Sequence, residues 1–422
     1  MRPPIRALLT TTLTTLACVF AVPTAVAAPV SNCFDATAPL TVEELRLDRP
    51  VPQQILDITG FNRFDQAFRI ALCAAPAPRA ATAAVAATGS LLWNTAVDRA
   101  QGRIPATGLD RTDDRPLYWT RLSLSRSLRQ WTPAFPLSPA DRDALLATLE
   151  RTSRGQDSIR FPAGRGLHRI LLSGFDPFVL DVDIRRSNPS GATALALDGT
   201  LIETPAGPAR IETATFPVNW DPFATGIVEQ TFLPHLLPGR RKVDMFTTVS
   251  QGRPERFDIE RYNGRWRGGF PDNLNLSRTG PIPIPAGIPT VLPAPEFVPT
   301  TLPFADIVAA NTGRFPVFDH TSVVEIPAGQ TTPVTQPNGP TPGSTARQGG
   351  GGDYLSNEIS YRTTLLRDAV HANVPGGHVH TPVLTFAPDN TTEITDPTFI
   401  QNRTDIINQV RSIVIVAAGT LR

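Results

Sequence analysis

A serine in the last quarter of the sequence is the clearest candidate nucleophile. Ser356 follows the turn-forming stretch Gly351-Gly352-Asp353. The residues after it are apolar at helical spacing: Ile359, Leu366, Ala369 and Val370. Ser356 is therefore expected close to a helix start, where free backbone N–H groups and the helix dipole favour a developing negative charge. The ordinary alternative is that Ser356 or Asn357 only caps that helix.

Aromatic and amide side chains follow a predicted strand upstream. The predicted strand at residues 169–173, aliphatic at its centre, runs into Gly174-Phe175-Asp176-Pro177-Phe178, and ligands of open α/β sheets usually bind at this carboxyl edge. Phe175 and Phe178 could sandwich a small flat ligand, although an isolated Phe-x-x-Phe pair belongs to the core more often. Asn188 precedes Pro189 and is expected to cap the next helix.

Acid and base candidates stand at two later positions. Gln251 follows a predicted strand and can bind an amide, and Glu260 is a carboxylate in a partly apolar setting. His378 and His380 lie two residues apart, which on a strand places both on one face. Two such histidines could bind a metal ion, but no third ligand is evident nearby. We therefore expect no metal site.

The elements that position these residues fall into an α/β pattern. Residues 28–160 are apolar at helical spacing and alanine-rich, which predicts a mostly helical amino-terminal extension. The α/β domain is expected over residues 161–422, where short aliphatic runs alternate with helical patterns. Its predicted strands include residues 169–173, 211–217, 243–249 and 379–384, with a crossover helix before the third strand and a helix or strand at 404–418. Residues 280–350 are rich in proline and glycine and are expected to form an irregular insertion.

Composition limits the partners of the protein. The 422 residues are 41% hydrophobic, enough for a substantial core. The formal charge of +1 provides no basic surface for nucleic acid or for an anionic membrane. We therefore expect neither partner.

The amino terminus has the pattern of an export signal over residues 1–27. Arg2 and Arg6 precede a largely apolar run, and Ala25-Val26-Ala27 supplies the small-x-small cleavage pattern. The run is shorter than a membrane span requires, so we expect a secreted protein with no membrane anchor after the signal is removed. Cleavage leaves Cys33 and Cys73, which either form a disulfide or remain two buried thiols.

The order of these motifs resembles that of pyroglutamyl peptidase I, also called pyrrolidone carboxyl peptidase. The resemblance covers roughly residues 168–390, about half of the chain, and lies in order and spacing rather than in one diagnostic motif. The matching segments are Gly174–Phe178, Asn188-Pro189-Ser190, Gln251, Glu260-Arg261, Phe270–Asn273, Thr301-Leu302-Pro303, Gly352-x-x-x-Ser356-Asn357 and His380-x-Pro382. The expected fold is a three-layer α/β/α core around a mixed sheet, decorated by the helical extension, and no cofactor is expected.

The resemblance implies a role for each candidate residue. In this family a cysteine attacks, a histidine acts as the base and a glutamate orients the histidine. By position, Glu260 is the orienting acid, His380 is the base and Ser356 takes the place of the cysteine. The remaining residues implied to bind substrate are Phe175, Phe178, Gln251, Asn188 and Tyr354.

The chain departs from the family pattern in three places. The nucleophile is a serine, and the segment from Gln251 to Glu260 is one residue shorter. The arginine expected before the Pro-Asp-Asn motif is replaced by Gly268-Gly269, with Arg267 close enough to support an oxyanion instead. Serine needs a well-placed base more than cysteine does, but a Ser–His–Glu arrangement is chemically complete.

These observations predict an exported hydrolase that removes an amino-terminal pyroglutamyl residue from a peptide or small amide. Two alternatives stay open. One is a catalytically inactive binding protein on the peptidase scaffold, and the other is a serine amidase with a different substrate. Because the family often forms homo-oligomers, a homo-oligomer is possible.

Overall fold

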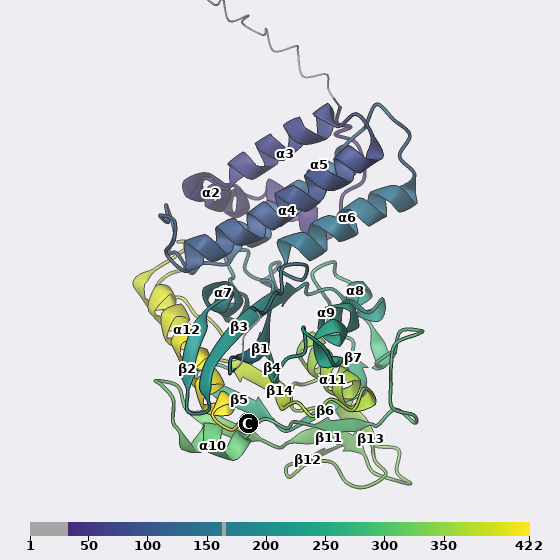
Figure 1. Ribbon diagram of the computed structural model, residues 1–422, viewed down its shortest axis with the longest axis vertical. Coiled ribbons are helices and arrows are strands. Elements are labelled where there is room, and N and C mark those ends of the chain that lie inside the picture. Colours follow the sequence, from purple (N-terminus) through teal and green to yellow (C-terminus); the bar gives the residue numbers. More distant parts are fainter. Residues whose placement is uncertain (1–32, 163–165) are drawn as a thin grey trace, which may run out of the picture.

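The computed structural model describes residues 33–162 and 166–422, and the predicted signal at 1–27 lies outside them. The described chain has a helical region, residues 33–153, which lies over one end of a central sheet (Figure 1). The helices of this region are α1 (Val42–Leu45), the 3-10 helix η1 (Arg46–Asp48), α2 (Pro50–Thr59), α3 (Asn62–Ala74), α4 (Pro78–Ala100), α5 (Arg115–Gln130) and α6 (Pro139–Ser153).

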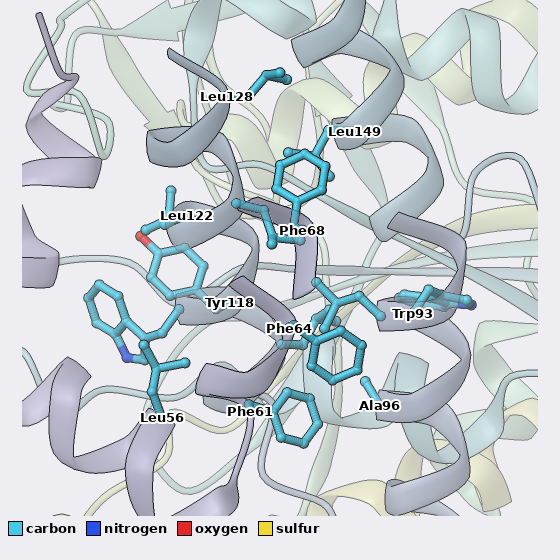
Figure 2. Close-up of a cluster of buried hydrophobic side chains, with 14 of the residues drawn as sticks. Leu56, Phe61, Phe64, Phe68, Trp93, Ala96, Tyr118, Leu122, Leu128 and Leu149 are labelled. Atoms are coloured by element: carbon cyan, nitrogen blue, oxygen red, sulfur yellow. The ribbon is translucent and has the colours of Figure 1, made fainter. Parts of the chain in front are cut away.

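The helical region has its own apolar core. Helix α3 buries Phe64, Phe68 and Leu72, which are spaced by four residues and so share one face. Figure 2 shows Phe64 and Phe68 among side chains of α4 and α5, including Trp93 and Leu122. The region is therefore a packed helical layer, as the sequence predicted.

Cys33 and Cys73 form a disulfide with a Cα–Cα distance of 5.9 Å. The bond ties the start of the described chain to the end of α3. The two cysteines are 40 residues apart, and on the chain-entropy account a loop of that length is worth about 4 kcal/mol of stability.

The central sheet has seven strands in the order β10-β5-β14-β4-β1-β3-β2. It is mixed, because β2 pairs antiparallel with β3 and β14 pairs antiparallel with β5, whereas the other neighbours are parallel. The strands are β1 (His168–Phe175), β2 (Leu201–Thr204), β3 (Gly207–Phe216), β4 (Met245–Gln251), β5 (Phe257–Glu260), β10 (Val317–His320) and β14 (Gly376–Thr381). The four strands predicted from aliphatic runs correspond to β1, β3, β4 and β14, although β14 begins and ends three residues earlier than expected.

Helices cover both faces of the sheet. Helices α7 (Pro189–Leu197), α10 (Phe304–Ala309) and α12 (Pro397–Ala418) bury one face, where Met245 and Val249 of β4 point. Helices α8 (Trp220–Ala224), α9 (Ile227–Leu236) and α11 (Leu355–Ala369) cover the other face, where Phe246 points. The predicted α/β class, with a mixed sheet, helices on both faces and a helical amino-terminal region, is confirmed.

Residues 280–350 are more ordered than the sequence predicted. They carry α10, the sheet strand β10 and several strands of smaller sheets, since the prolines and glycines there mark turns between short strands. These strands are β9 (Phe297–Pro299), β11 (Val323–Ile326), β12 (Val334–Gln336) and β13 (Thr345–Gln348). Strand β9 pairs with β6 (Tyr262–Gly264), which precedes the insertion. A further two-stranded sheet is formed by β7 (Trp266–Gly268) and β8 (Thr279–Pro281). The three-stranded sheet β12-β11-β13 lies at the opposite end of the molecule from the helical region (Figure 1).

Within residues 33–162 and 166–422, no helix combines the length and the apolar character that crossing a bilayer requires.

Candidate active site

Polar side chains form a row across four neighbouring strands of the sheet. Strand β4 lies beside β14, β14 beside β5, and β5 beside β10. Glu260 is in register with His378 on one side and with His320 on the other, and His380 is in register with Ser250. Residues in register share a face of the sheet. The row therefore lies on the α9 and α11 face, next to the start of α11.

Glu260 accepts hydrogen bonds from two histidines. His380 Nδ1 lies 2.6 Å from Glu260 Oε1, and His320 Nδ1 lies 2.6 Å from Glu260 Oε2. Burial alone would raise the pKa of Glu260, but the hydrogen bonds from His320 and His380 outweigh it and lower the pKa to about 2. The carboxylate is thus ionised at neutral pH and holds each ring with its Nδ1–H toward Glu260.

His320 is a residue of this site that the sequence analysis missed. Its Nε2 accepts a hydrogen bond of 2.8 Å from Arg253 Nη2, so its two ring nitrogens have opposite roles. The residue lies 60 positions from Glu260 in the proline-rich insertion. The available signal was the short strand-like run Val317-Phe318-Asp319-His320, whose aromatic residue and β-branched valine favour a strand.

His378 is bound within the sheet instead of facing a cavity. Its Nδ1 and Nε2 lie 2.8 Å from the hydroxyls of Thr248 and Ser250. Burial, reinforced by the neighbouring His380, lowers the pKa of His378 well below its usual range. His378 is therefore neutral and supports the ring of His380, which lies 4.7 Å away between centroids. Across the described ranges no cluster of three His, Cys, Asp or Glu side chains is arranged to hold a metal ion.

Ser356 is the second residue of α11, and Tyr354 is the cap. The alternative that Ser356 or Asn357 caps the helix is therefore wrong: the amide of Asn357 instead bonds to Gly264 of β6. Ser356 Oγ donates to the Gly351 carbonyl oxygen over 2.9 Å. Among the described residues no hydrogen bond joins Ser356 to His380, but both line one cavity of about 380 Å³, together with Glu260 and His320.

A second, smaller cavity meets the first at Ser356. This apolar slot of about 30 Å³ shares Gln251 and Ser356 with the larger cavity, here called the polar cavity. All five residues predicted to bind substrate line the slot: Phe175, Phe178, Asn188, Gln251 and Tyr354. Phe178 and Tyr354 lie 6.2 Å apart between ring centroids. The slot thus has aromatic walls and opens at the candidate nucleophile.

The two amide side chains of the slot differ in whether a hydrogen-bonding group is free to bind a ligand. Asn188 caps α7, as predicted, and its Nδ2 donates to the Asp176 carbonyl oxygen. Its hydrogen-bonding groups are therefore committed to the protein. Gln251 Oε1 is buried and, in the part of the chain that the structure describes, has no hydrogen-bond partner. A buried acceptor without a donor is costly, which makes Gln251 the natural partner of an N–H group of a ligand.

Arg267 lies apart from both cavities. Its guanidinium makes a two-pronged ion pair with the buried Glu358, with Nε 2.6 Å from Oε2, and it stacks near Trp220. It is not among the residues that line the slot or the polar cavity. The oxyanion role suggested for Arg267 therefore gains no support, and the first-turn amides of α11 are the nearer candidates.

Two glycines allow the site to close around Glu260 and His380. A Cβ at Gly350 would stand 2.1 Å from Glu260 Oε2, and a Cβ at Gly252 would stand 2.7 Å from His380 Cβ. Any larger residue at either position would displace one of the two side chains. Gly349, Gly350 and Gly351 thus form a close-packed wall of the site, here called the glycine wall.

Two family models match the chain. One, described as "PA0049 N-terminal domain", matches residues 24–150, and the other, described as "PA0049, C-terminal domain", matches residues 169–295 and 307–385. A Pseudomonas aeruginosa (strain PAO1) protein described as "Uncharacterized protein PA0049" is 35% identical, over 93% of this chain and 91% of that protein.

Solved structures with a similar arrangement include two peptidases. Pyroglutamyl peptidase I of Bacillus amyloliquefaciens is 19% identical with a TM-score of 0.40, over 60% of this chain and 97% of that chain. A mutant pyrrolidone carboxyl peptidase of Pyrococcus furiosus is 20% identical with a TM-score of 0.38, over 59% of this chain and 97% of that chain.

Proposed function

The chain belongs to the PA0049 family, and we propose that it is a hydrolase that removes an amino-terminal pyroglutamyl residue from a peptide or small amide. The observation that carries the proposal is the position of Ser356. It lines both the aromatic slot and the polar cavity that contains the His380–Glu260 pair. A substrate with its ring in the slot would present the next carbonyl group at this serine.

In the proposed first half-reaction, Ser356 Oγ attacks that carbonyl carbon while His380 Nε2 takes the hydroxyl proton. Glu260 holds His380 in the tautomer that leaves Nε2 free and stabilises the imidazolium that forms. His380 then gives the proton to the leaving amine as the C–N bond breaks. The pyroglutamyl group remains as an ester on Ser356.

In the second half-reaction, a water molecule gives a proton to His380 and attacks the ester carbon. The ester bond breaks, the proton returns to Ser356 Oγ, and pyroglutamate leaves. In both steps the first-turn amides of α11 are suited to stabilise the oxyanion. Ser356 must first turn away from the Gly351 carbonyl oxygen, and the lost hydrogen bond costs about 1 kcal/mol.

In this proposal the lactam ring of the substrate binds in the slot. Phe175 and Phe178 supply apolar walls, and the free Gln251 Oε1 accepts the ring N–H. The rest of the peptide, which leaves as the amine, would lie in the polar cavity. Because the Gln251 acceptor has no hydrogen-bond partner among the residues that the structure describes, a ring that lacks the N–H would bind poorly.

One observation favours an alternative without turnover. The hydroxyl of Ser356 is hydrogen-bonded to Gly351 and not to a base, as expected of a binding protein on a peptidase scaffold. Incubation with a pyroglutamyl-arylamide and with a plain aminoacyl-arylamide separates the possibilities. Release of arylamine from the first supports the proposal, release only from the second indicates a different serine amidase, and saturable binding without release indicates a binding protein.

We also propose that the protein is exported and that cleavage follows Ala27. The Cys33–Cys73 disulfide is compatible with an oxidising compartment. Amino-terminal sequencing of protein recovered outside the cytoplasm of a producing host should begin at or near Ala28. Recovery of the uncleaved chain from the cytoplasm alone would contradict export.

A further inference from the structure

The turn between the two slot phenylalanines is bonded to the helical region. Asp176 Oδ2 accepts a hydrogen bond of 2.6 Å from Arg121 Nη2 of α5 and one of 2.7 Å from Nη1 of Arg154, which is the cap residue directly after α6. All three side chains are at most 5% exposed. Charge-assisted hydrogen bonds of this kind are strong and directional when they are shielded from water.

A second contact from the helical region reaches the same turn. Glu43 of α1 accepts a hydrogen bond of 3.0 Å from Asn273 Nδ2, and the same amide donates to the Pro177 carbonyl oxygen over 3.0 Å. Glu43 is buried and also accepts from Asn219 Nδ2 over 3.0 Å. Glu43 therefore orients the amide that holds Pro177.

A third contact acts through the cap of α7. Asp114, at the start of α5, accepts a hydrogen bond of 3.0 Å from the backbone N–H of Asn188. Asn188 Nδ2 in turn donates to the Asp176 carbonyl oxygen over 2.8 Å. The carboxylate of Asp176 and the carbonyl groups of Asp176 and Pro177 are thus all held, directly or through one intermediary, by the helical region.

The shortest contact of Arg121 is the one with Asp176. Its side chain is fully buried, and within the described residues its one hydrogen bond goes to Asp176, while Nε and Nη1 have no hydrogen-bond partner. Glu150 lies 3.9 Å from Nε. An apolar side chain of similar size would hold the helical region against the turn at Asp176 at least as strongly, because burying a charge costs free energy. The arginine therefore contributes geometry at Asp176 more than docking strength.

We propose that the helical region positions the aromatic slot: Arg121 and Arg154 fix Asp176, so that Phe175 and Phe178 stay spaced for a flat ring. Arg121 is in this sense a positioning residue for substrate binding. The inference rests on the proposed function for the identity of the ring. It assigns to the helical region, together with Arg154 at the end of α6, a role in ligand recognition.

Arg121→Met tests the proposal, since methionine fills the space and leaves Asp176 paired with Arg154. With the full chain and a pyroglutamyl-arylamide, we expect KM to rise about tenfold while kcat changes less than about threefold. Hydrogen exchange in residues 174–180 should become faster than in the wild-type protein. Arg121→Lys keeps a charge near Asp176, so its KM and its exchange rates should lie between those of the wild-type protein and of Arg121→Met.

Arg129→Gln is the matched control, because Arg129 lies on the same helix and pairs with Glu44 inside the helical region. It should change neither KM nor exchange in residues 174–180. Values for Arg121→Met equal to those of Arg129→Gln would overturn the proposal. If Arg121→Met does not fold, Arg121→Lys carries the same comparison. If the wild-type protein cleaves no substrate, the proposed function fails, and the exchange measurement still decides whether Arg121 holds the turn.

Discussion

His320 Nδ1 and His380 Nδ1 donate to the two oxygens of Glu260, each over 2.6 Å. The carboxylate is therefore held on both sides and cannot rotate without breaking a charge-assisted hydrogen bond. His380 comes from β14 and His320 from β10, on opposite sides of β5. The insertion that carries β10 thus completes the acid–base pair of the proposed reaction.

Replacing His320 should weaken catalysis more than substrate binding. In His320→Ala, Glu260 loses one donor and becomes free to turn away from His380, so we expect kcat to fall about tenfold with little change in KM. His320→Asn places an amide N–H near the position of Nδ1 and should recover most of kcat. Steady-state kinetics with a pyroglutamyl-arylamide provide the measurement.

Asp319→Asn is the control for this substitution, because Asp319 is adjacent on β10 and pairs with Arg261 instead. It should leave kcat unchanged. A histidine tautomer measurement by nitrogen NMR gives a readout without substrate. The prediction is wrong if His320→Ala keeps both the wild-type kcat and the Nδ1–H tautomer of His380.

Asp114 should make the protein less stable as pH rises toward neutrality. Burial, with the neighbouring charge of Asp113, raises the pKa of Asp114 to about 7, although hydrogen bonds from Ser187 and Asn188 and the charge of Arg403 oppose the shift. A carboxyl with a raised folded-state pKa stabilises the fold below its unfolded pKa, and this contribution is lost as pH rises through about 7. Urea unfolding between pH 4 and 8 should show the decline.

Asp114→Asn should flatten that decline. Asparagine can accept from the Asn188 N–H and donate to Ser187 Oγ, so the local hydrogen bonds survive without a charge. The free energy of unfolding should still decline somewhat as pH rises, because burial also raises the pKa of Glu212 to about 7. Glu260 acts in the opposite sense and only at the acid end of this range: its pKa is lowered to about 2, so its stabilisation is present above its unfolded pKa and is lost as pH falls from there toward about 2. An unchanged slope in Asp114→Asn would exclude Asp114 as its source.

Ser356→Ala should abolish turnover and leave the fold intact. The substitution removes the proposed nucleophile but only one hydrogen bond, to Gly351, so kcat should fall by at least about 10³ while stability changes by about 1 kcal/mol. Ser356→Cys should retain turnover, because a thiol needs less help from a base than a hydroxyl does.

Ser360→Ala is matched to Ser356→Ala. Ser360 lies one turn further along α11, is fully buried, and its Oγ has no hydrogen-bond partner among the described residues. Loss of this hydroxyl should affect neither turnover nor stability appreciably. Equal kcat values for Ser356→Ala and the wild-type protein would remove Ser356 from the mechanism.

The sequence predicted the layers of the fold better than the local details of the site. Aliphatic runs such as residues 169–173 are long enough to identify buried strands, and the cap at Asn188 follows from one residue and its neighbour. The position of Ser356 within α11 was predicted only approximately. The helix begins at Leu355, and its cap residue Tyr354 makes no side-chain hydrogen bond to the helix. Since tyrosine is not among the residues favoured at a helix cap, the sequence does not identify this start.

The contacts of His320, Arg121 and Arg267 could not be predicted for a different reason. Each depends on pairing between distant segments: His320 with Glu260 across 60 residues, Arg121 with Asp176 across 55, and Arg267 with Glu358 across 91. Spacing along one helix or strand carries no information about such pairs. Their partners become apparent only when the packing of the helices and strands against one another is known.

Gly350→Ala should disable the site from the side of the glycine wall. The new Cβ would stand 2.1 Å from Glu260 Oε2, so Glu260 must move and lose its bond to His320, its bond to His380, or both. We expect kcat to fall at least about tenfold, with a stability loss of about 1–3 kcal/mol from overpacking.

Gly329→Ala separates displacement of Glu260 from backbone strain. Gly329 lies in the same insertion with φ +76°, and its Cβ would meet nothing within 4 Å. Alanine there should cost about 1 kcal/mol of stability because of the left-handed backbone, yet leave kcat unchanged. Comparable kcat losses in the two variants would mean that the insertion acts through its overall stability. A loss confined to Gly350→Ala would instead trace the effect to Glu260 and its two histidines.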